Sequence, residues 1–407
     1  MSKDVLMFSP GYPAEMPYFT RGLAEVGARV WGLGDQPAGA LPDEARHALA
    51  GYLKVRDLWD ERRLLDEIQR WRGPRAFDRV ECLWEPGMIL AARLREALGA
   101  AGMSEAETVP FRDKGRMKEV LDAAGLRTPR HFRAKTADGV REAAERVGYP
   151  VCVKPIAGAG SADTHKVTDP GELERVLQLT QHVPEVSVEE WIEGEEYTFD
   201  TICADGRILY YNVAWYRPKP IVGRSVEWIS PQTVTLRDVD HPDLQGGIQL
   251  GLRVLKALGF HTGFTHMEWF RKPDGEAVFG EIAARPPGAR STEIMNYGCD
   301  IDVFRGWAEA VVHGRWSQPL ERKYNSAVIF KRAQGQGRIK SIEGLDALLE
   351  HYGDWIVNVN LLPLGAPRRN WKATLISDGY IILRHPNLGA CLEMADRVGT
   401  HLRLVAG

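Results

Sequence analysis

A strand–turn–strand segment that carries two glutamates constrains the fold of this chain more than any other stretch. Residues 263–285 read GFTHMEWFRKPDGEAVFGEIAAR, where two apolar runs flank the turn sequence KPDG, so we predict a β-hairpin. In that register Glu268 and Glu281 lie on paired strands. A carboxylate on each of two buried strands is costly unless a cation meets it. The hairpin therefore predicts either a salt bridge with Arg285 or a site for a divalent cation such as Mg²⁺.

Length and charge exclude several classes of protein. A chain of 407 residues exceeds what one core usually organises, so we expect several domains. Lys and Arg number 52 and Asp and Glu 55, a balance that argues against a nucleic-acid or membrane-surface partner. No segment approaches the roughly 18–20 apolar residues of a membrane span, and the apolar run at the N-terminus is too short for a signal peptide. Five cysteines without CxxC spacing are typical of reduced thiols, so we expect a globular cytoplasmic protein.

Apolar runs alternate with helix-like stretches near the N-terminus. The runs DVLMFS, ARVWGLG and RVECLW predict a parallel sheet with helices on both faces. Ligands of such sheets sit at the carboxyl ends of the strands, which indicates residues 9–12 and Glu85. Glu85 is then either a solvated loop carboxylate or a group that faces a substrate amine. The G-x-G-x-x-G pattern does not follow the first strand, which argues against a nicotinamide dinucleotide site.

Two lysines have neighbours that suit phosphate. We expect Asp113 to cap a helix whose first turn holds Lys114, and helix N-termini attract phosphate, although an isolated lysine there is more often solvated. The strand VCVK ends at Lys154, and the small-residue loop AGAGSA (157–162) follows. Small residues let backbone N–H groups approach a phosphate closely. The alternative is a plain hairpin turn, and the loop is not a Walker A motif.

Further candidate residues lie on strands and in one loop. The run VEEWI (188–192) predicts a strand end that can contact an adenine edge, with Glu196 placed to accept hydrogen bonds from ribose hydroxyls. The alternative is an acidic surface turn. Glu227 lies in a loop-rich segment and either faces a substrate ammonium or belongs to a surface hairpin. His266 is either a core histidine or a catalytic group.

Taken together, these motifs resemble those of the ATP-grasp superfamily. The ordered set is RDK, VCVKP, the GAGS loop, VEEWIEGEEYTFD, HMEWF and GEIAARPPG, and the likeness covers about residues 1–310. The resemblance implies an α/β and α+β multidomain protein. A Rossmann-like domain (1–110) is followed by an ATP-grasp fold of two α+β subdomains (111–188 and 189–316). We expect a β-rich C-terminal domain with two short helices (317–407).

The resemblance also implies roles for individual residues. Glu268 and Glu281 would bind Mg²⁺ or Mn²⁺, and Arg285 would hold the acyl phosphate or the substrate carboxylate, which makes these three the catalytic set. The expected ATP ligands are Lys114 and Lys154 on the phosphates, Gly158, Gly160 and Ser161 in the covering loop, Glu189, Trp191 and Ile192 around the adenine, and Glu196 on the ribose. The expected substrate contacts are Glu85, Glu227, His266 and Arg285.

The substrate branch rests on fewer residues. The pairing of H-x-E with E-x-A-A-R is most similar to the bacterial L-amino-acid (dipeptide) ligases. Many ATP-grasp ligases carry Asn two residues after the second glutamate, where this chain has Ala283. The dipeptide ligases share a small residue there, and so do the carboxylating and formate-using enzymes of the purine pathway. The departure leaves the branch open.

We therefore expect an ATP-dependent carboxylate–amine ligase that works through an acyl phosphate and releases ADP and phosphate. Phosphoryl transfer needs positioning and charge neutralisation, which these residue types supply. The alternatives are an ATP-dependent carboxylase or formate-using ligase, and a nucleotide-binding module without turnover. The expected partners are small-molecule carboxylates and amines, with no nucleic acid or membrane, and the resemblance implies a homodimer.

Overall fold

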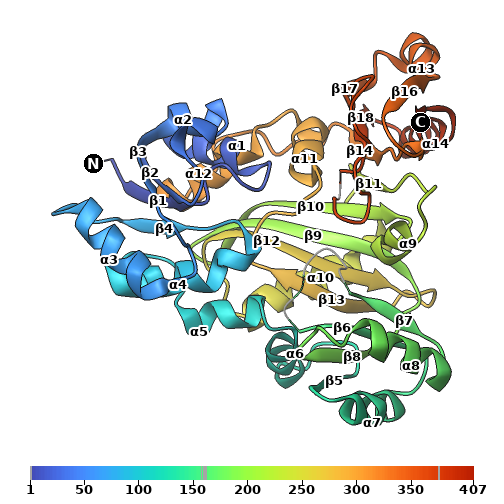
Figure 1. The fold of residues 1–407 in the computed structure, drawn as a ribbon, viewed down its shortest axis with the longest axis horizontal. Helices are drawn as coiled ribbons and strands as arrows, with labels where there is room; N and C mark the ends of the chain where they lie inside the picture. Colours follow the sequence, from blue (N-terminus) through green and yellow to red (C-terminus); the bar gives the residue numbers. More distant parts are fainter. Residues whose placement is uncertain (1, 157, 159–162, 375) are drawn as a thin grey trace.

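The computed structural model describes residues 2–156, 158, 163–374 and 376–407, which form three sheet-based regions around one large sheet (Figure 1). The N-terminal region lies beside one end of this sheet, residues 114–190 lie below it, and the C-terminal segment lies at its other end. None of the helices within these described ranges is long and apolar enough to cross a membrane.

The N-terminal region holds a four-stranded parallel sheet in the order β3-β2-β1-β4, as the alternating pattern predicts. Its strands are β1 (Asp4–Phe8), β2 (Arg29–Gly34), β3 (Leu49–Lys54) and β4 (Arg79–Glu81). All five residues of β1 are buried, because DVLMF is the central strand and helices cover it. The helices and 3-10 turns of this region are α1 (Met16–Glu25), η1 (Ala38–Ala40), α2 (Asp43–Ala48), α3 (Glu61–Arg72), η2 (Glu85–Gly87), α4 (Met88–Leu98), α5 (Glu105–Thr108) and η3 (Val109–Phe111).

The small subdomain is a four-stranded antiparallel sheet in the order β5-β8-β6-β7. Its strands are β5 (His131–Ala134), β6 (Val151–Pro155), β7 (His165–Val167) and β8 (Val186–Glu190), and its helices are α6 (Lys114–Ala123), α7 (Ala137–Val147) and α8 (Pro170–Leu179). The Asp113 side chain accepts from the Arg116 backbone N–H at 2.8 Å, so the predicted cap of α6 is confirmed. β8 runs to Glu190, past the boundary predicted between residues 188 and 189.

The large sheet has eight strands in the order β13-β12-β9-β10-β11-β14-β18-β17. These are β9 (Glu195–Ala204), β10 (Arg207–Arg217), β11 (Gln232–Thr235), β12 (Gly263–Arg271), β13 (Ala277–Ala283), β14 (Asn325–Phe330), β17 (Ile356–Leu361) and β18 (Gly379–His385). The predicted hairpin is β12–β13, and its antiparallel register sets Glu268 opposite Glu281. A β-bulge follows that pair and shifts the register of the two strands beside the two carboxylates.

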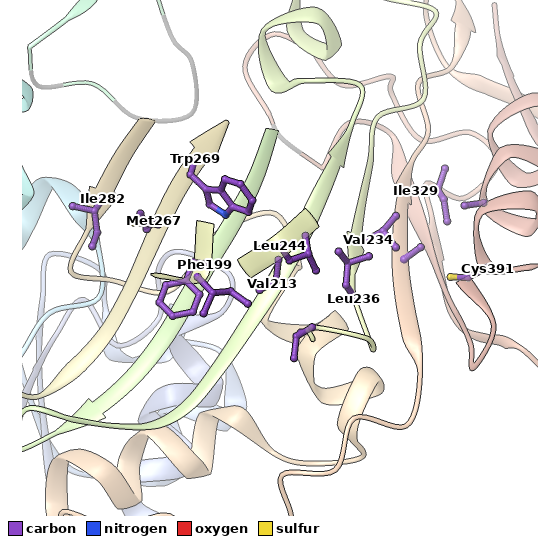
Figure 2. Packing of buried hydrophobic residues seen from close by; sticks show 14 of the residues in the cluster. Phe199, Val213, Val234, Leu236, Leu244, Met267, Trp269, Ile282, Ile329 and Cys391 are labelled. Carbon is purple, nitrogen blue, oxygen red and sulfur yellow. The ribbon is translucent and has the colours of Figure 1, made fainter. Parts of the chain in front are cut away.

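The core of the large sheet continues across strands that are far apart in sequence. Buried side chains extend from Ile282 on β13 through Trp269 and Val234 to Ile329 on β14 (Figure 2). Helix α10 (Pro242–Ala257) packs on this layer with Gly247 directly over the Trp269 ring. Burial of such side chains contributes about 1.5–3 kcal/mol each, so this layer supports the strands that carry the site.

The C-terminal segment is β-rich with two helices, as expected. Strands β15 (Gln334–Gly335), β19 (Arg403–Ala406) and β16 (Ile339–Glu343) form a small sheet in that order, with α13 (Leu345–Tyr352) and α14 (Leu388–His401) beside it. Strands β14, β17 and β18 instead extend the large sheet, so the sheet continues across the boundary predicted between residues 316 and 317.

Helices α11 (Ser291–Cys299) and α12 (Val303–His313) join the N-terminal region to the large sheet. The Phe19 ring of α1 lies 4.8 Å from Phe304 and 5.3 Å from Trp307 between ring centroids. Arg21 pairs with Asp302 at 2.6 Å. Together, the ring contacts of Phe19 and the ion pair of Arg21 hold the parallel sheet in place relative to the large sheet, which contains the β12–β13 hairpin.

Candidate active site

A cavity of about 120 Å³, which we call the first cavity, lies between the small subdomain and the large sheet. Strands β6 and β8 supply one wall and strands β12 and β13 the other (Figure 1). The residues singled out from the sequence that line it are Lys114, Lys154, Gly158, Glu189, Trp191, Ile192, Glu196, His266, Glu268, Glu281 and Arg285. Gly160 and Ser161 lie outside the described residues.

Glu268 and Glu281 face the first cavity from neighbouring strands. Their side chains are 30% and 23% exposed, so both carboxylates are reachable from the cavity. Glu281 Oε1 lies 3.0 Å from Lys114 Nζ, and Glu268 Oε1 accepts from the Tyr216 hydroxyl at 3.4 Å. Burial disfavours the charge of Glu281, but Lys114 and Lys154 more than offset it and lower the pKa of that carboxyl.

The donor set around this pair suits a hard cation that keeps other ligands. Within the described residues, no group of three or more His, Cys, Asp or Glu side chains is placed to hold a metal ion. Two carboxylates on paired strands leave the remaining positions to water and phosphate oxygens, which is the mode of binding that Mg²⁺ prefers. The residues present therefore fit a magnesium ion held together with a phosphate ligand.

Three lysines share Glu281 of this pair and a further carboxylate, Glu189. Lys118 and Lys154 contact opposite oxygens of Glu189, at 2.8 and 3.0 Å. Lys114 Nζ contacts Glu281 and donates to the Gly158 carbonyl at 2.7 Å. The cluster carries one positive charge in excess, and preorganised cations of this kind stabilise phosphate groups.

Glu189 lies near the end of strand β8, as the sequence indicates, but its carboxylate is already paired. Its carboxylate is 2% exposed and is engaged by Lys118, Lys154 and the Ser187 hydroxyl. Sequence reasoning missed Lys118, although it follows Lys114 by four residues and so lies on the same face of α6. Burial lowers the pKa of Lys118 to about 8 despite the attraction of Glu189.

An apolar wall lies next to the lysines. Ile192 is buried, Trp191 is half-buried, and Phe270 and Ile221 complete the lining. Glu196 is buried nearby, where burial and then the charge of Glu268 raise the pKa of its carboxyl well above the usual value. The cavity thus has both apolar and charged lining residues.

Arg285 is held by Glu85, which comes from the carboxyl edge of the parallel sheet. Glu85 Oε2 lies 2.6 Å from Arg285 Nη2 and accepts from its Nε at 2.7 Å, and Arg112 pairs with the other oxygen. The Glu85 carboxylate is 7% exposed, so its interpretation as a solvated loop group is wrong. Both of its oxygens already bind arginines, because tertiary contacts bring residues 85, 112 and 285 together. Sequence reasoning missed Arg112.

His266 lies between the Glu268 carboxylate and a buried aspartate. Its Nδ1 lies 2.6 Å from Asp200 Oδ1, and its Nε2 lies 3.4 Å from Glu268. Burial opposes protonation, but the contacts with Asp200 and Glu268 raise the pKa of His266 to about 9. Asp200 is 1% exposed and was missed from the sequence, since only the β9–β12 pairing sets it opposite His266.

Glu227 lies outside the first cavity. It pairs with Arg368 of the C-terminal segment and lines a different cavity, described below. Lys219 and Ile221, which line the first cavity, lie at the start of the short helix α9 (Pro220–Ser225), and Glu227 follows the end of that helix. The structure therefore does not bring Glu227 to the cavity that His266 and Arg285 line, and its role as a substrate contact stays a prediction.

Comparisons with known proteins agree with this geometry. Residues 111–217 match the family model of the ATP-grasp domain. The chain is 27% identical over 257 residues to the L-arginine-specific L-amino acid ligase of Bacillus subtilis, covering 61% of this chain and 60% of that protein. It is 37% identical over 147 residues to the D-alanine–D-alanine ligase of Stutzerimonas stutzeri (strain A1501), covering 33% and 44%. These matches span less than two thirds of the relatives' own lengths.

Solved structures share the whole architecture. The L-amino acid ligase from Bacillus licheniformis superimposes with a TM-score of 0.81 at 19% identity, over 100% of this chain and 99% of that one. The N5-carboxyaminoimidazole ribonucleotide synthetase from Thermotoga maritima gives a TM-score of 0.71 at 16% identity, over 100% of both chains. At these identities the likeness establishes the fold.

Proposed function

We propose that this chain, an ATP-grasp protein by its domain match and its fold, is an ATP-dependent carboxylate–amine ligase. It joins a small-molecule carboxylate to an amine through an acyl phosphate and releases ADP and phosphate. The observation that carries this proposal is the meeting of three groups around the first cavity. These are the lysines on Glu189, the paired Glu268 and Glu281, and the Arg285 guanidinium.

Each group has a place in the proposed reaction. Lys114 and Lys154 bind the ATP phosphates, and Ile192 and Trp191 flank the adenine. Glu268 and Glu281 hold Mg²⁺, which when bound neutralises phosphate charge. Arg285 faces the cavity from its salt bridge with Glu85 and orients the acyl phosphate or the substrate carboxylate. Phosphoryl transfer needs this positioning and charge neutralisation rather than a protein nucleophile.

The amine-ligase branch is supported by the named relatives. Two relatives carry ligase names, the L-arginine-specific L-amino acid ligase and the D-alanine–D-alanine ligase. The lysines themselves lie within residues 111–217, which match the ATP-grasp domain model. Enzymes of the carboxyaminoimidazole type have the same fold, so the carboxylase or formate-using alternative requires its own assay arm. We propose amino acids as the first substrates to test.

The test is Mg²⁺-dependent phosphate release from ATP across a grid of amino acids and amines, with separate arms that contain bicarbonate or formate. We expect release to rise with a pair of amino acids, and mass spectrometry should detect an amide product. Stimulation by bicarbonate or formate alone would move the chain to the alternative branch. Absence of turnover in every arm, with ATP bound, would contradict the ligase proposal.

Glu281→Gln tests the role of the paired carboxylates. Loss of one charged metal ligand should lower phosphate release by at least about a hundredfold, since such electrostatic groups act directly on the developing charge. The matched control is Glu276→Gln, whose exposed carboxylate pairs with Lys272 in the turn of the same hairpin. Full activity of Glu281→Gln would remove the metal assignment.

A further inference from the structure

A second cavity, of about 310 Å³, lies between the C-terminal segment and the loop that follows α9. Four cationic side chains line it, and Glu227 is the acidic residue among its described lining residues. The cations are Lys331, Arg332, Arg368 and Arg403. This cavity shares no described lining residue with the first cavity.

Lys331 and Arg332 carry charge without a carboxylate partner among the described residues. Lys331 is 4% exposed, and its ammonium donates to Ser230 Oγ at 2.9 Å and to the carbonyls of Gly399 and Val398 at 2.6 and 3.3 Å. Arg332 donates to the carbonyls of Gly223 and Val226, at 2.7 and 2.8 Å. Hydrogen bonds to neutral groups compensate a buried charge only in part, so both side chains are costly as they stand.

The cost is visible in the pKa values of both groups. Burial lowers the pKa of Lys331 to about 8. Burial, with the nearby charge of Arg224, lowers the pKa of Arg332 to about 10. A carboxylate partner would raise the pKa of an ammonium or guanidinium group. The pKa values of Lys331 and Arg332 are lowered instead, which indicates that their positive charges are not fully compensated.

Arg368 adds a third buried cation. Its side chain is 7% exposed, pairs with Glu227 and lies 3.6 Å from Asp378. Its buried Nε has no hydrogen-bond partner among the described residues. Arg403 is exposed and is the fourth cationic residue that lines the cavity. The nearby carboxylates are those of Glu227 and Asp378, so the positive charges outnumber the negative ones.

We propose that the second cavity binds a small oxyanion, a phosphate or carboxylate group of a metabolite, between Lys331, Arg332 and Arg403. An anion there supplies the missing counter-charge, and charge-assisted hydrogen bonds are stronger than neutral ones. The exposed indole of Trp228, 82% accessible at the mouth, offers an apolar surface to the rest of the ligand. The proposal goes beyond the ligase function and does not depend on it.

The test is isothermal titration calorimetry of the full chain with inorganic phosphate and, separately, with acetate, at constant ionic strength set by chloride. The Lys154→Met variant removes one lysine that lines the first cavity. Binding that persists in it and is weakened by the variants of the second cavity described next belongs to the second cavity. We expect one saturable site in Lys154→Met for phosphate, for acetate or for both, and the probe that binds names the anion class.

Variants of the second cavity separate this site from nonspecific binding. Lys331→Met and Arg403→Gln should each weaken the binding by about tenfold or more, the loss expected for one charge-assisted contact. Lys340→Met is the matched control, since Lys340 is an exposed lysine of the same segment outside the cavity lining, and it should bind as the parent does. Circular dichroism verifies that each variant folds. If Lys331→Met does not fold, the test rests on Arg403→Gln, because Arg403 is exposed and its replacement should leave the fold intact.

Three outcomes would overturn the proposal. These are no saturable binding of either anion, binding that is lost in Lys154→Met, and binding that persists unchanged in both Lys331→Met and Arg403→Gln. Failure of the ligase assay would leave this titration unaffected, so the two proposals stand or fall separately.

Discussion

At the scale of single residues, the interior of this protein is organised by buried charges that share partners. Glu189 is the clearest case, because its two oxygens each serve a different lysine. Removal of one member of a buried ion pair leaves an uncompensated charge and usually costs several kcal/mol. Lys118 contacts no ligand in the proposed reaction, but it is therefore as important to the site as Lys114 and Lys154, which do.

Lys118→Met tests this dependence. The variant leaves Glu189 with Lys154 alone, so Lys154 is held more tightly by the carboxylate and is less available to phosphate. We expect a loss of about 3 kcal/mol in the free energy of unfolding and a severalfold rise in KM for ATP, measured by denaturant titration and steady-state kinetics. Glu119→Gln, at an exposed position on the same helix, is the control. Parent-like values for Lys118→Met would contradict the shared-partner interpretation.

Lys331 gives a pH prediction with a defined sign. Burial brings its folded-state pKa to about 8, whereas 10.5 is the ordinary value for the unfolded chain. Between these values the unfolded state binds one more proton, so stability rises with pH across this window. The other charged residues that line the same cavity are Arg332, Arg368, Arg403 and Glu227.

The measurement compares the free energy of unfolding of the parent with that of Lys331→Met from pH 7.5 to 10. We expect the parent to gain stability relative to the variant as pH rises. A pH-independent difference would mean that Lys331 keeps its proton throughout. When phosphate or acetate saturates the second cavity, the gain in stability of the parent relative to Lys331→Met should disappear.

At the scale of elements, the layer of α10 on the large sheet depends on close approach at two glycines. A Cβ on Gly247 would lie 2.2 Å from the Trp269 ring, and one on Gly251 would lie 2.3 Å from the Phe199 ring. Both rings are fully buried, so neither can move without a shift of the strands. This contact fixes the height of α10 above the strands β9 and β12.

Gly247→Ala should therefore destabilise the chain by about 1–3 kcal/mol through overpacking. The neighbouring Gly246 provides a matched control, because its Cβ would meet Ala277 at an ordinary 3.4 Å. Gly246→Ala should be neutral or stabilise by up to about 1 kcal/mol through helix propensity. Thermal or denaturant unfolding of the two variants measures the difference, and equal effects would contradict the packing explanation.

At the scale of the whole molecule, α9 lies between the two cavities. Lys219 and Ile221 line the first cavity. On the other side, Arg332 binds the carbonyls of Gly223 and Val226, and Arg368 pairs with Glu227. The C-terminal segment thus holds a wall of the proposed nucleotide site.

Glu227→Gln tests this connection at a residue that lies outside the first cavity. Loss of the pair with Arg368 loosens the α9 segment, so we expect the Kd of a non-hydrolysable ATP analogue to rise about two- to fivefold. Glu350→Gln, at an exposed position of α13, should leave that Kd unchanged. An unaltered Kd in Glu227→Gln would show that the two cavities are independent.

The sequence alone determined the local features of this protein. The alternation of apolar residues around KPDG, the cap at Asp113 and the strand–helix alternation near the N-terminus each depend on neighbours in sequence, and each is confirmed. The resemblance of the ordered motifs to the ATP-grasp superfamily also implied the grouping of Lys114, Lys154, Glu268, Glu281 and Arg285, which line one cavity.

Only the tertiary structure decided which charges meet. Glu85 is buried on two arginines that lie 27 and 200 residues away, and Glu227 pairs with Arg368, which is 141 residues away. Asp200 meets His266 through the pairing of β9 with β12. Such contacts depend on packing between elements, and the pattern of one segment carries no information about the segment against which it packs. For the same reason the uncompensated cations of the second cavity appeared only once the C-terminal segment was placed against the loop that follows α9.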